Sequence, residues 1–283
     1  MIFLKPKNFL QLFFQFFINL FFRLRISIKK KFNNYSNNTL FLSGDFFQSL
    51  EKTTGNNKII FKSLKNFPKI IDYEQYKKKT WIFHNSDEIF DLNKKKRLDF
   101  FKPQKCYSQN LALNKKNYIF IPIGLENRKF CNHGDTEDFF RLRKQKFNKI
   151  SKVLFGFNTT NKKRIRIRKY LKKLEICSET KGWNSYFYRR ILVKHMFVAC
   201  PEGNGIDTHR LWEALYLRTI PIIEKNKISD FFIKAKLPVM ILNKWSDLSK
   251  LNENNLQKIY LSKKKLFNNK YLFQKYWRNI ITN

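Results

Sequence analysis

The chain has 283 residues, of which 43% are hydrophobic, and this composition excludes a disordered chain. The length allows one large domain or two domains of about 130 residues each. The formal net charge is +37, from 58 Lys and Arg against 21 Asp and Glu. This charge favours polyanionic partners such as nucleic acid, anionic lipid or a phosphorylated substrate, although A/T-rich codons, which also enrich Asn, Phe and Ile, explain much of it.

Residues 8–22 form an apolar stretch that the basic run 23–31 follows. Its polar residues recur at three- or four-residue steps and would form one narrow stripe on a helix: Asn8, Gln11, Gln15 and Asn19. About 15 residues are too few to span a bilayer, which needs about 20. The pattern predicts an amphipathic helix within segment 1–34 that lies on an anionic membrane surface. A helix buried on a partner domain and a targeting segment are the alternatives.

Residues 32–57 are polar and rich in Asn, which predicts a linker or loop. Further along, short apolar runs typical of buried strands alternate with segments of helical spacing. The predicted strands are 58–62, 80–84, 118–123, 152–157, 196–200, 219–223 and 238–242. The predicted helices are 162–174, 183–195, 206–217 and 252–267. This alternation indicates an α/β fold with parallel sheets. The basic segment 141–149 is the predicted boundary between domains 35–145 and 146–283.

The cysteines and histidines show no metal-binding pattern. The four cysteines, Cys106, Cys131, Cys177 and Cys200, contain no C-x-x-C pair, and a chain of this size does not depend on disulfides. We expect them to be reduced and mostly buried, as in a cytoplasmic protein. The sequence also has no D-x-D and no set of His and Cys at metal-ligand spacing. We therefore expect neither a metal nor a cofactor.

In the N-terminal half, polar clusters follow three apolar runs, at 84–88, 107–110 and 124–127. Three strands that end in polar groups suggest one rim of a sheet, where ligands of α/β proteins bind. Three titratable groups at this rim are candidate bases: Asp87, which we prefer, His84 and Glu88. Further candidates for substrate contact are Asn85, Asn110 and Glu126. Alternatively, His84 and Asn85 cap the strand end and Asp87 starts a helix.

The segment 196–224 reads as a strand, a Gly-rich turn, a helix and a second strand. Gly203 and Gly205 allow the backbone to approach a ligand closely, and the amides at the start of the helix favour an anion. Arg210 adds a cation in the first turn, and Glu213 could accept hydrogen bonds from vicinal hydroxyls such as those of a ribose. The alternatives are a structural turn and an Arg210–Glu213 helix pair.

The run PEGNGIDTHRLWEALYLRTIPII closely resembles the C-terminal signature of exostosin-like glycosyltransferases. The positions that match P-x-G-x-G-x-D-x-x-R-x-W-E-A-L are Pro201, Gly203, Gly205, Asp207, Arg210, Trp212, Glu213, Ala214 and Leu215, and Ile220-Pro221 match the following I-P. The match covers about 25 residues. The chain departs from the pattern at Arg218-Thr219, where the family often has a small pair, and an arginine there could touch a diphosphate.

An upstream element, Phe157-Asn158 to Asn161 and Arg164, is similar to an F-N-x-x-T-N-x-x-R element of the same enzymes. A similar element occurs in α-1,3-fucosyltransferase-like enzymes, where the arginine meets the donor nucleotide. The resemblance implies a phosphate role for Arg164, although Arg166 and Arg168 are equally available and the helix could simply be a solvated basic one.

Together these resemblances imply a GT-B-like enzyme with two Rossmann-like domains facing a cleft. It would transfer a sugar, without metal and with inversion, from a nucleoside-diphosphate sugar to a glycan or lipid-linked glycan. Asp87, His84 or Glu88 would be the base, and the acceptor would bind at Asn85, Asn110 and Glu126. The implied donor site comprises Asn158, Arg164, Gly203, Asn204, Gly205, Asp207, Thr208, Arg210 and Glu213. The alternatives are a nucleic-acid-binding protein, which lacks any recognisable motif here, and an inactive glycosyltransferase-like scaffold.

Overall fold

The computed structural model describes residues 41–53, 58–130, 133–180 and 184–283, together with Phe13, Phe17 and Leu20. The predicted amphipathic and basic stretch at 8–31 lies outside the described residues apart from these three positions. In the part of the chain that is described, no helix combines the length and the apolar character needed to cross a bilayer.

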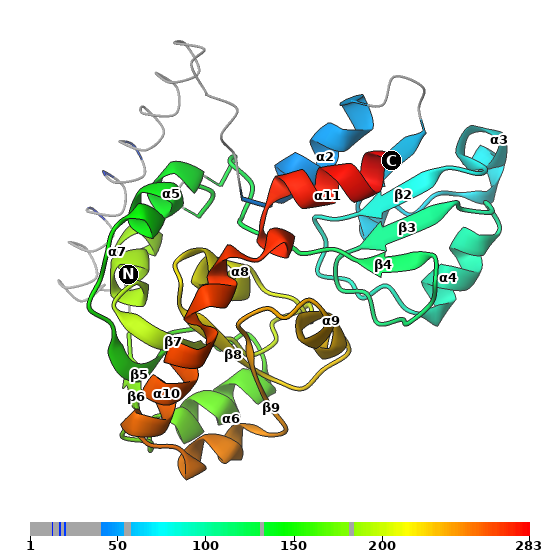
Figure 1. Cartoon of the computed structure of the whole chain (residues 1–283). Helices are drawn as coiled ribbons and strands as arrows, with labels where there is room; N and C mark the ends of the chain where they lie inside the picture. Colours follow the sequence, from blue (N-terminus) through cyan, green and yellow to red (C-terminus); the bar gives the residue numbers. More distant parts are fainter. Residues whose placement is uncertain are drawn as a thin grey trace, which may run out of the picture.

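The chain folds into two sheets, each with its own helices (Figure 1). The first sheet has the order β1-β2-β3-β4 and the second has the order β6-β5-β7-β8-β9. Every strand pair in both sheets is parallel, which confirms the predicted α/β class with parallel sheets. The first sheet contains β1 (Ile59–Lys62), β2 (Thr80–Phe83), β3 (Lys105–Ser108) and β4 (Tyr118–Phe120). The second contains β5 (Ile150–Phe155), β6 (Cys177–Glu179), β7 (His195–Ala199), β8 (Ile220–Glu224) and β9 (Met240–Leu242).

The helices are divided between the two sheets in nearly the same order as the chain. Those that accompany the first sheet are α2 (Gly44–Thr53), α3 (Tyr73–Tyr76), α4 (Leu92–Asp99) and the final helix α11 (Gln274–Thr282). Those that accompany the second are α5 (Thr136–Lys144), α6 (Lys162–Leu171), α7 (Ser185–Leu192), α8 (His209–Tyr216), α9 (Ser229–Lys234) and α10 (Glu253–Lys263). Short 3-10 helices are η1 (Leu64–Asn66), η2 (Ile70–Asp72), η3 (Trp245–Lys250), η4 (Lys264–Asn268) and η5 (Lys270–Leu272).

Helices also occupy parts of the predicted linker and of the basic segment at the predicted boundary. Helix α2 forms inside the predicted linker 32–57. It can pack because Phe46, Phe47 and Leu50 give it one apolar face that is buried in the core. Helix α5 contains the first four residues of the predicted boundary 141–149, and Leu142 and Arg143 are buried there. A basic helix needs only a few apolar positions to pack when its cations find acceptors, so the basic segment 141–149 begins as a helix.

The final helix returns from the second sheet to the first. Trp277, only 1% exposed, packs in the same hydrophobic cluster as Phe47 and Leu50 of α2. The Tyr107 hydroxyl of β3 donates a hydrogen bond of 2.8 Å to the carbonyl of Ile280. Figure 1 shows α11 beside α2 above the first sheet. Helix α11 therefore holds the two sheets in one unit.

Two cations, the buried Arg143 and the half-buried Lys149, hold the carboxyl end of α8. Arg143 donates to the carbonyls of Leu215 and Tyr216 at 3.3 and 2.8 Å. The Lys149 ammonium donates to the Leu217 carbonyl at 3.3 Å, and burial lowers the pKa of Lys149 to about 7. Cations are favourable at the negative end of a helix dipole. The opposite, amino end of α8 points at the Gly-rich turn.

Candidate functional site

The Gly-rich turn connects β7 to α8 at the carboxyl edge of the second sheet. All five residues of β7 are buried, and the chain then turns through Pro201–Gly205, where the Gly203 amide donates to the Gly205 carbonyl at 3.1 Å. Helix α8 begins at His209, later than predicted. Its N-cap residue is Thr208, whose side chain makes no capping hydrogen bond to the described residues of the helix. The amino end of α8 is therefore available to an anion.

The two glycines of the turn allow close protein packing. A Cβ atom at Gly205 would lie 2.6 Å from Nδ2 of Asn110, which belongs to the first sheet. A Cβ atom at Gly203 would lie 3.1 Å from the Arg164 guanidinium. Gly205 is therefore required where the edges of the two sheets meet, a reason that the sequence by itself did not give.

Arg164 binds backbone carbonyls of the Gly-rich turn and of the segment before α6. Its guanidinium donates to the carbonyls of Glu202 (2.8 Å), Asn158 (3.1 Å) and Pro201 (3.1 Å). Asn161, which caps α6, donates from its amide to the Gly203 carbonyl at 3.3 Å. Arg164 thus shapes the turn through its carbonyls and adds positive charge there. Asn158 itself is exposed and contributes its carbonyl.

Arg210 and Glu213 lie on the first two turns of α8. The Arg210 guanidinium donates to the Tyr188 hydroxyl of α7 and to the Gly156 carbonyl at 3.4 Å, and it lies 4.8 Å from the Tyr188 ring centroid. The half-buried Glu213 carboxylate has no hydrogen bond or ion pair with any residue in the described part of the chain. The sequence did not indicate Tyr188 as a partner of Arg210, because Tyr188 lies 22 positions away on a different helix.

Asp207 joins the two sheets. Its Oδ2 accepts from the Ile123 amide at 2.8 Å, its Oδ1 accepts from the Thr208 amide at 2.9 Å, and both oxygens accept from the Trp212 indole. The Asp207 amide donates to Oδ1 of Asn110 at 2.8 Å. Burial raises the pKa of Asp207 to about 6. The carboxylate proposed for the donor site is thus fully engaged by protein donors.

His84 is enclosed at the end of β2. It is 1% exposed, and its ring nitrogens face Oδ1 of Asn85 at 3.0 Å and the Pro122 carbonyl at 3.1 Å. Burial lowers the pKa of His84 to about 4, so the ring is neutral near pH 7. This geometry matches the alternative in which His84 and Asn85 stabilise the strand end, and it keeps His84 away from any substrate hydroxyl.

Asp87 lies beside the Gly-rich turn. It is exposed, and its Oδ2 accepts from the Asn204 amide at 3.3 Å, which links the two sheets across 117 positions of sequence. Glu88, by contrast, lies 3.5 Å from the Lys94 ammonium. Of the three candidate bases, Asp87 is the one that the structure places in contact with the predicted donor turn.

The predicted acceptor-side residues take part in contacts within the first sheet and between the sheets. Asn85 Oδ1 accepts from Nδ2 of Asn127 at 3.0 Å. Asn110, fully buried, binds the Ser86 carbonyl at 3.1 Å and the Asp207 amide. Glu126 lies 3.3 Å from His209 of α8, whose other ring nitrogen is 2.9 Å from the Gly124 carbonyl. These three residues hold the rim together.

Arg218, at the departure from the family pattern, lies at the opposite end of α8. The eight residues His209–Tyr216 separate it from the Gly-rich turn, which is about 12 Å at 1.5 Å per residue. The expectation that Arg218 could touch a diphosphate at the turn was therefore wrong. Its φ of 55° is in the left-handed region, where glycine is the favoured residue after a helix.

The described residues contain no group of three or more His, Cys, Asp or Glu side chains that could hold a metal ion. The cysteines that the structure describes, Cys106, Cys177 and Cys200, are free thiols. Arg164, Arg210 and the amino end of α8 place positive charge at the Gly-rich turn.

The chain is similar in structure to a glycosyltransferase of known structure. A crystal structure of an α1,3-fucosyltransferase is similar to this chain, with a TM-score of 0.41 and 13% sequence identity, over 74% of this chain and 75% of that chain. No family model and no curated protein matches the chain.

Proposed function

We propose that the chain is a glycosyltransferase of GT-B-like architecture that transfers a sugar from a nucleoside-diphosphate donor to a glycan hydroxyl. One observation carries the proposal. The exposed Asp87 carboxylate of the first sheet meets Asn204 of the Gly-rich turn, and that turn leads into the uncapped helix α8 with Arg210 and Glu213. An exposed carboxylate thus lies at the turn that leads into the amino end of α8, and this contact supports the proposal.

The donor diphosphate would bind at the amino end of α8. Backbone amides and the helix dipole favour an anion at this position, and Arg210, held by Tyr188, adds a fixed positive charge. Negative charge that develops on the leaving diphosphate would be stabilised by the same groups, because they are already oriented before reaction. We propose that this replaces a metal ion.

Glu213 would bind the ribose and Asp87 would act on the acceptor. A carboxylate can accept two hydrogen bonds from vicinal hydroxyls, and Glu213 is half-buried one turn beyond Arg210. Asp87 would remove the proton from the attacking hydroxyl as that oxygen displaces the diphosphate with inversion.

We propose that the reaction takes place in the cytoplasm, with peripheral contact at the inner face of the membrane through residues 8–31.

A thermal-shift panel of nucleoside diphosphates and nucleotide sugars, including UDP and GDP forms, tests the donor site. We expect at least one of them to raise the Tm of the wild-type chain. Glu213→Ala and Arg210→Ala are expected to abolish the shift, and Tyr188→Phe to reduce it, since it removes one hydrogen bond worth about 1 kcal/mol. Arg166→Ala and Glu253→Ala, on exposed helix positions, are the matched controls.

The same panel can overturn the proposal. A wild-type chain that melts identically with every nucleotide would remove the donor site. A salt-dependent shift on random DNA, with no response to nucleotides, would instead support the nucleic-acid-binding alternative.

A further inference from the structure

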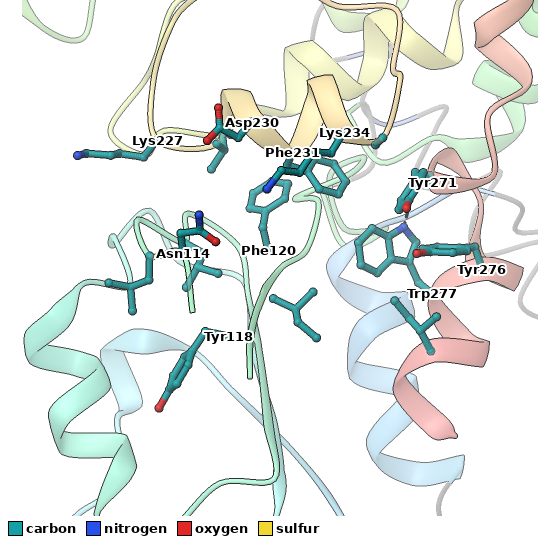
Figure 2. Close-up of a pocket in the computed structure, with 16 residues that line it drawn as sticks. Asn114, Tyr118, Phe120, Lys227, Asp230, Phe231, Lys234, Tyr271, Tyr276 and Trp277 are labelled. Atoms are coloured by element: carbon teal, nitrogen blue, oxygen red, sulfur yellow. Dashed lines mark hydrogen bonds between the residues drawn. The ribbon is translucent and has the colours of Figure 1, made fainter. Parts of the chain in front are cut away.

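A cavity of about 360 Å³ lies away from the Gly-rich turn. It is bounded by the edge strand β4, by α9 of the second sheet and by α11 (Figure 2). Its volume is within the range of small-molecule sites, about 300–1,000 Å³. None of the residues of the proposed donor site lines it.

The lining of this cavity is mainly apolar and aromatic. Phe231 comes from α9, Ile119 from β4, Leu113 from the loop before β4, and Tyr276 and Ile280 from α11. All five side chains are half-buried, so they keep apolar surface exposed in the absence of an occupant. Covering apolar surface gains about 25 cal/mol per Å², so a hydrocarbon group has a reason to bind.

The mouth of the cavity carries an excess of positive charge. Lys227, Asp230 and Lys234 lie on the α9 side (Figure 2), and all three are exposed. Neither lysine has an ion-pair partner among the residues that the structure describes. Two cations against one carboxylate favour an occupant with an anionic end outside the apolar space.

The cavity borders the proposed reaction site along the chain. Leu111, which lines the cavity, directly follows Asn110, which binds the Asp207 amide. Phe120 of the neighbouring strand β4 lines the cavity, and Ile123, in the segment that follows β4, donates its amide to Asp207. Two short stretches of chain therefore connect the lining of the cavity to the residues that hold Asp207.

We propose that this cavity binds the hydrocarbon chain of a lipid phosphate, with the phosphate held by Lys234 and Lys227, and that the sugar acceptor is linked to such a lipid. The acceptor role rests on the proposed glycosyltransferase function. Binding of the lipid phosphate rests only on the apolar lining and the charge at the mouth.

Titration calorimetry with dodecyl phosphate, below the concentration at which it forms micelles, tests the site. We expect saturable binding of one molecule per chain. Dodecyl maltoside, which has the same hydrocarbon chain and an uncharged head, should bind at least about tenfold more weakly, equivalent to about 1.4 kcal/mol. Equal affinity for the two would overturn the anionic head, and no saturable binding of dodecyl phosphate would overturn the site.

Variants locate the binding. Leu113→Glu places a carboxylate against the hydrocarbon chain and should abolish binding, and Lys227→Glu with Lys234→Glu should weaken it by about tenfold or more. Lys225→Glu with Lys236→Glu, at exposed positions outside the lining, is the control and should bind as the wild type does. Unchanged binding in Leu113→Glu, or dimerisation that Leu113→Glu abolishes, would overturn this assignment.

The nucleotide thermal shift, measured on the same samples, separates the two proposals. A chain that binds dodecyl phosphate but no nucleotide would keep the lipid-phosphate site and lose the glycosyltransferase function. A chain that binds a nucleotide but not dodecyl phosphate would lose this inference alone.

Discussion

Asp207 shows how burial changes the task of a single carboxylate. It stands in the anion-binding segment, yet its oxygens accept from Ile123, Thr208 and Trp212. These donors are neutral, and His209 adds a smaller electrostatic effect that also lowers the pKa. Burial then dominates and raises the pKa of Asp207 from 3.8 to about 6.

This pKa predicts a pH dependence of stability. Between about pH 6 and pH 4 the folded carboxyl binds a proton that the unfolded one does not, so its contribution to the free energy of unfolding rises as pH falls. Urea unfolding of the wild type and Asp207→Asn at pH 7 and pH 5 measures this. The wild type should gain about 1 kcal/mol relative to the variant at pH 5. A difference that is the same at both pH values would contradict the raised pKa.

The two ends of helix α8 have different electrostatic surroundings. Its amino end follows the Gly-rich turn, and its carboxyl end is bound by the cations Arg143 and Lys149. Arg218 directly beyond it has a φ of 55°. A side chain other than glycine in this conformation costs about 1 kcal/mol.

Arg218→Gly is therefore expected to stabilise the protein by up to about 1 kcal/mol, because glycine adopts this conformation without a Cβ clash. It should leave the nucleotide thermal shift unchanged, since the position is remote from the turn. Arg218→Ala is the control: it removes the charge and keeps the strained Cβ, so it should give a smaller gain. Denaturant unfolding compares the three proteins, and an equal gain in both variants would assign the effect to charge.

At the scale of the molecule, the two sheets meet through a few polar contacts. Asn110 binds the Asp207 amide, His209 approaches Glu126, and Asn204 binds Asp87. Gly205 also lies close to Asn110, since a Cβ atom added at Gly205 would lie 2.6 Å from the Asn110 side chain. The proposed reaction site depends on this closeness.

Gly205→Ala is therefore expected to lower the free energy of unfolding by about 1–3 kcal/mol, the usual cost of overpacking, and to weaken nucleotide binding. Adding Asn110→Ala removes the clash, so the alanine at 205 should then cost much less. A double-mutant cycle by urea unfolding measures this coupling. Gly203→Ala is the control, since its new Cβ meets only the end of the Arg164 side chain at 3.1 Å. Purely additive costs would contradict the proposed contact.

Helices and strands whose residues follow a strong apolar period could be predicted from the sequence alone. Strands such as β7 and β8 are continuous apolar runs because parallel strands are covered on both faces, and α8 has an apolar stripe that identifies it. Weak signals failed. The short, half-buried β6 has no apolar run, and α2 was hidden in a polar segment.

Only the tertiary structure decided which polar groups face one another. Asp87 and Asn204 lie 117 positions apart, and no local pattern encodes their contact. His84, Asp87 and Glu88 are all able to act as bases, yet packing buries the first, pairs the third with Lys94 and leaves Asp87 beside the Gly-rich turn. Local sequence fixes backbone conformation through sterics and apolar period, whereas the environment of a charged group depends on how the two sheets pack.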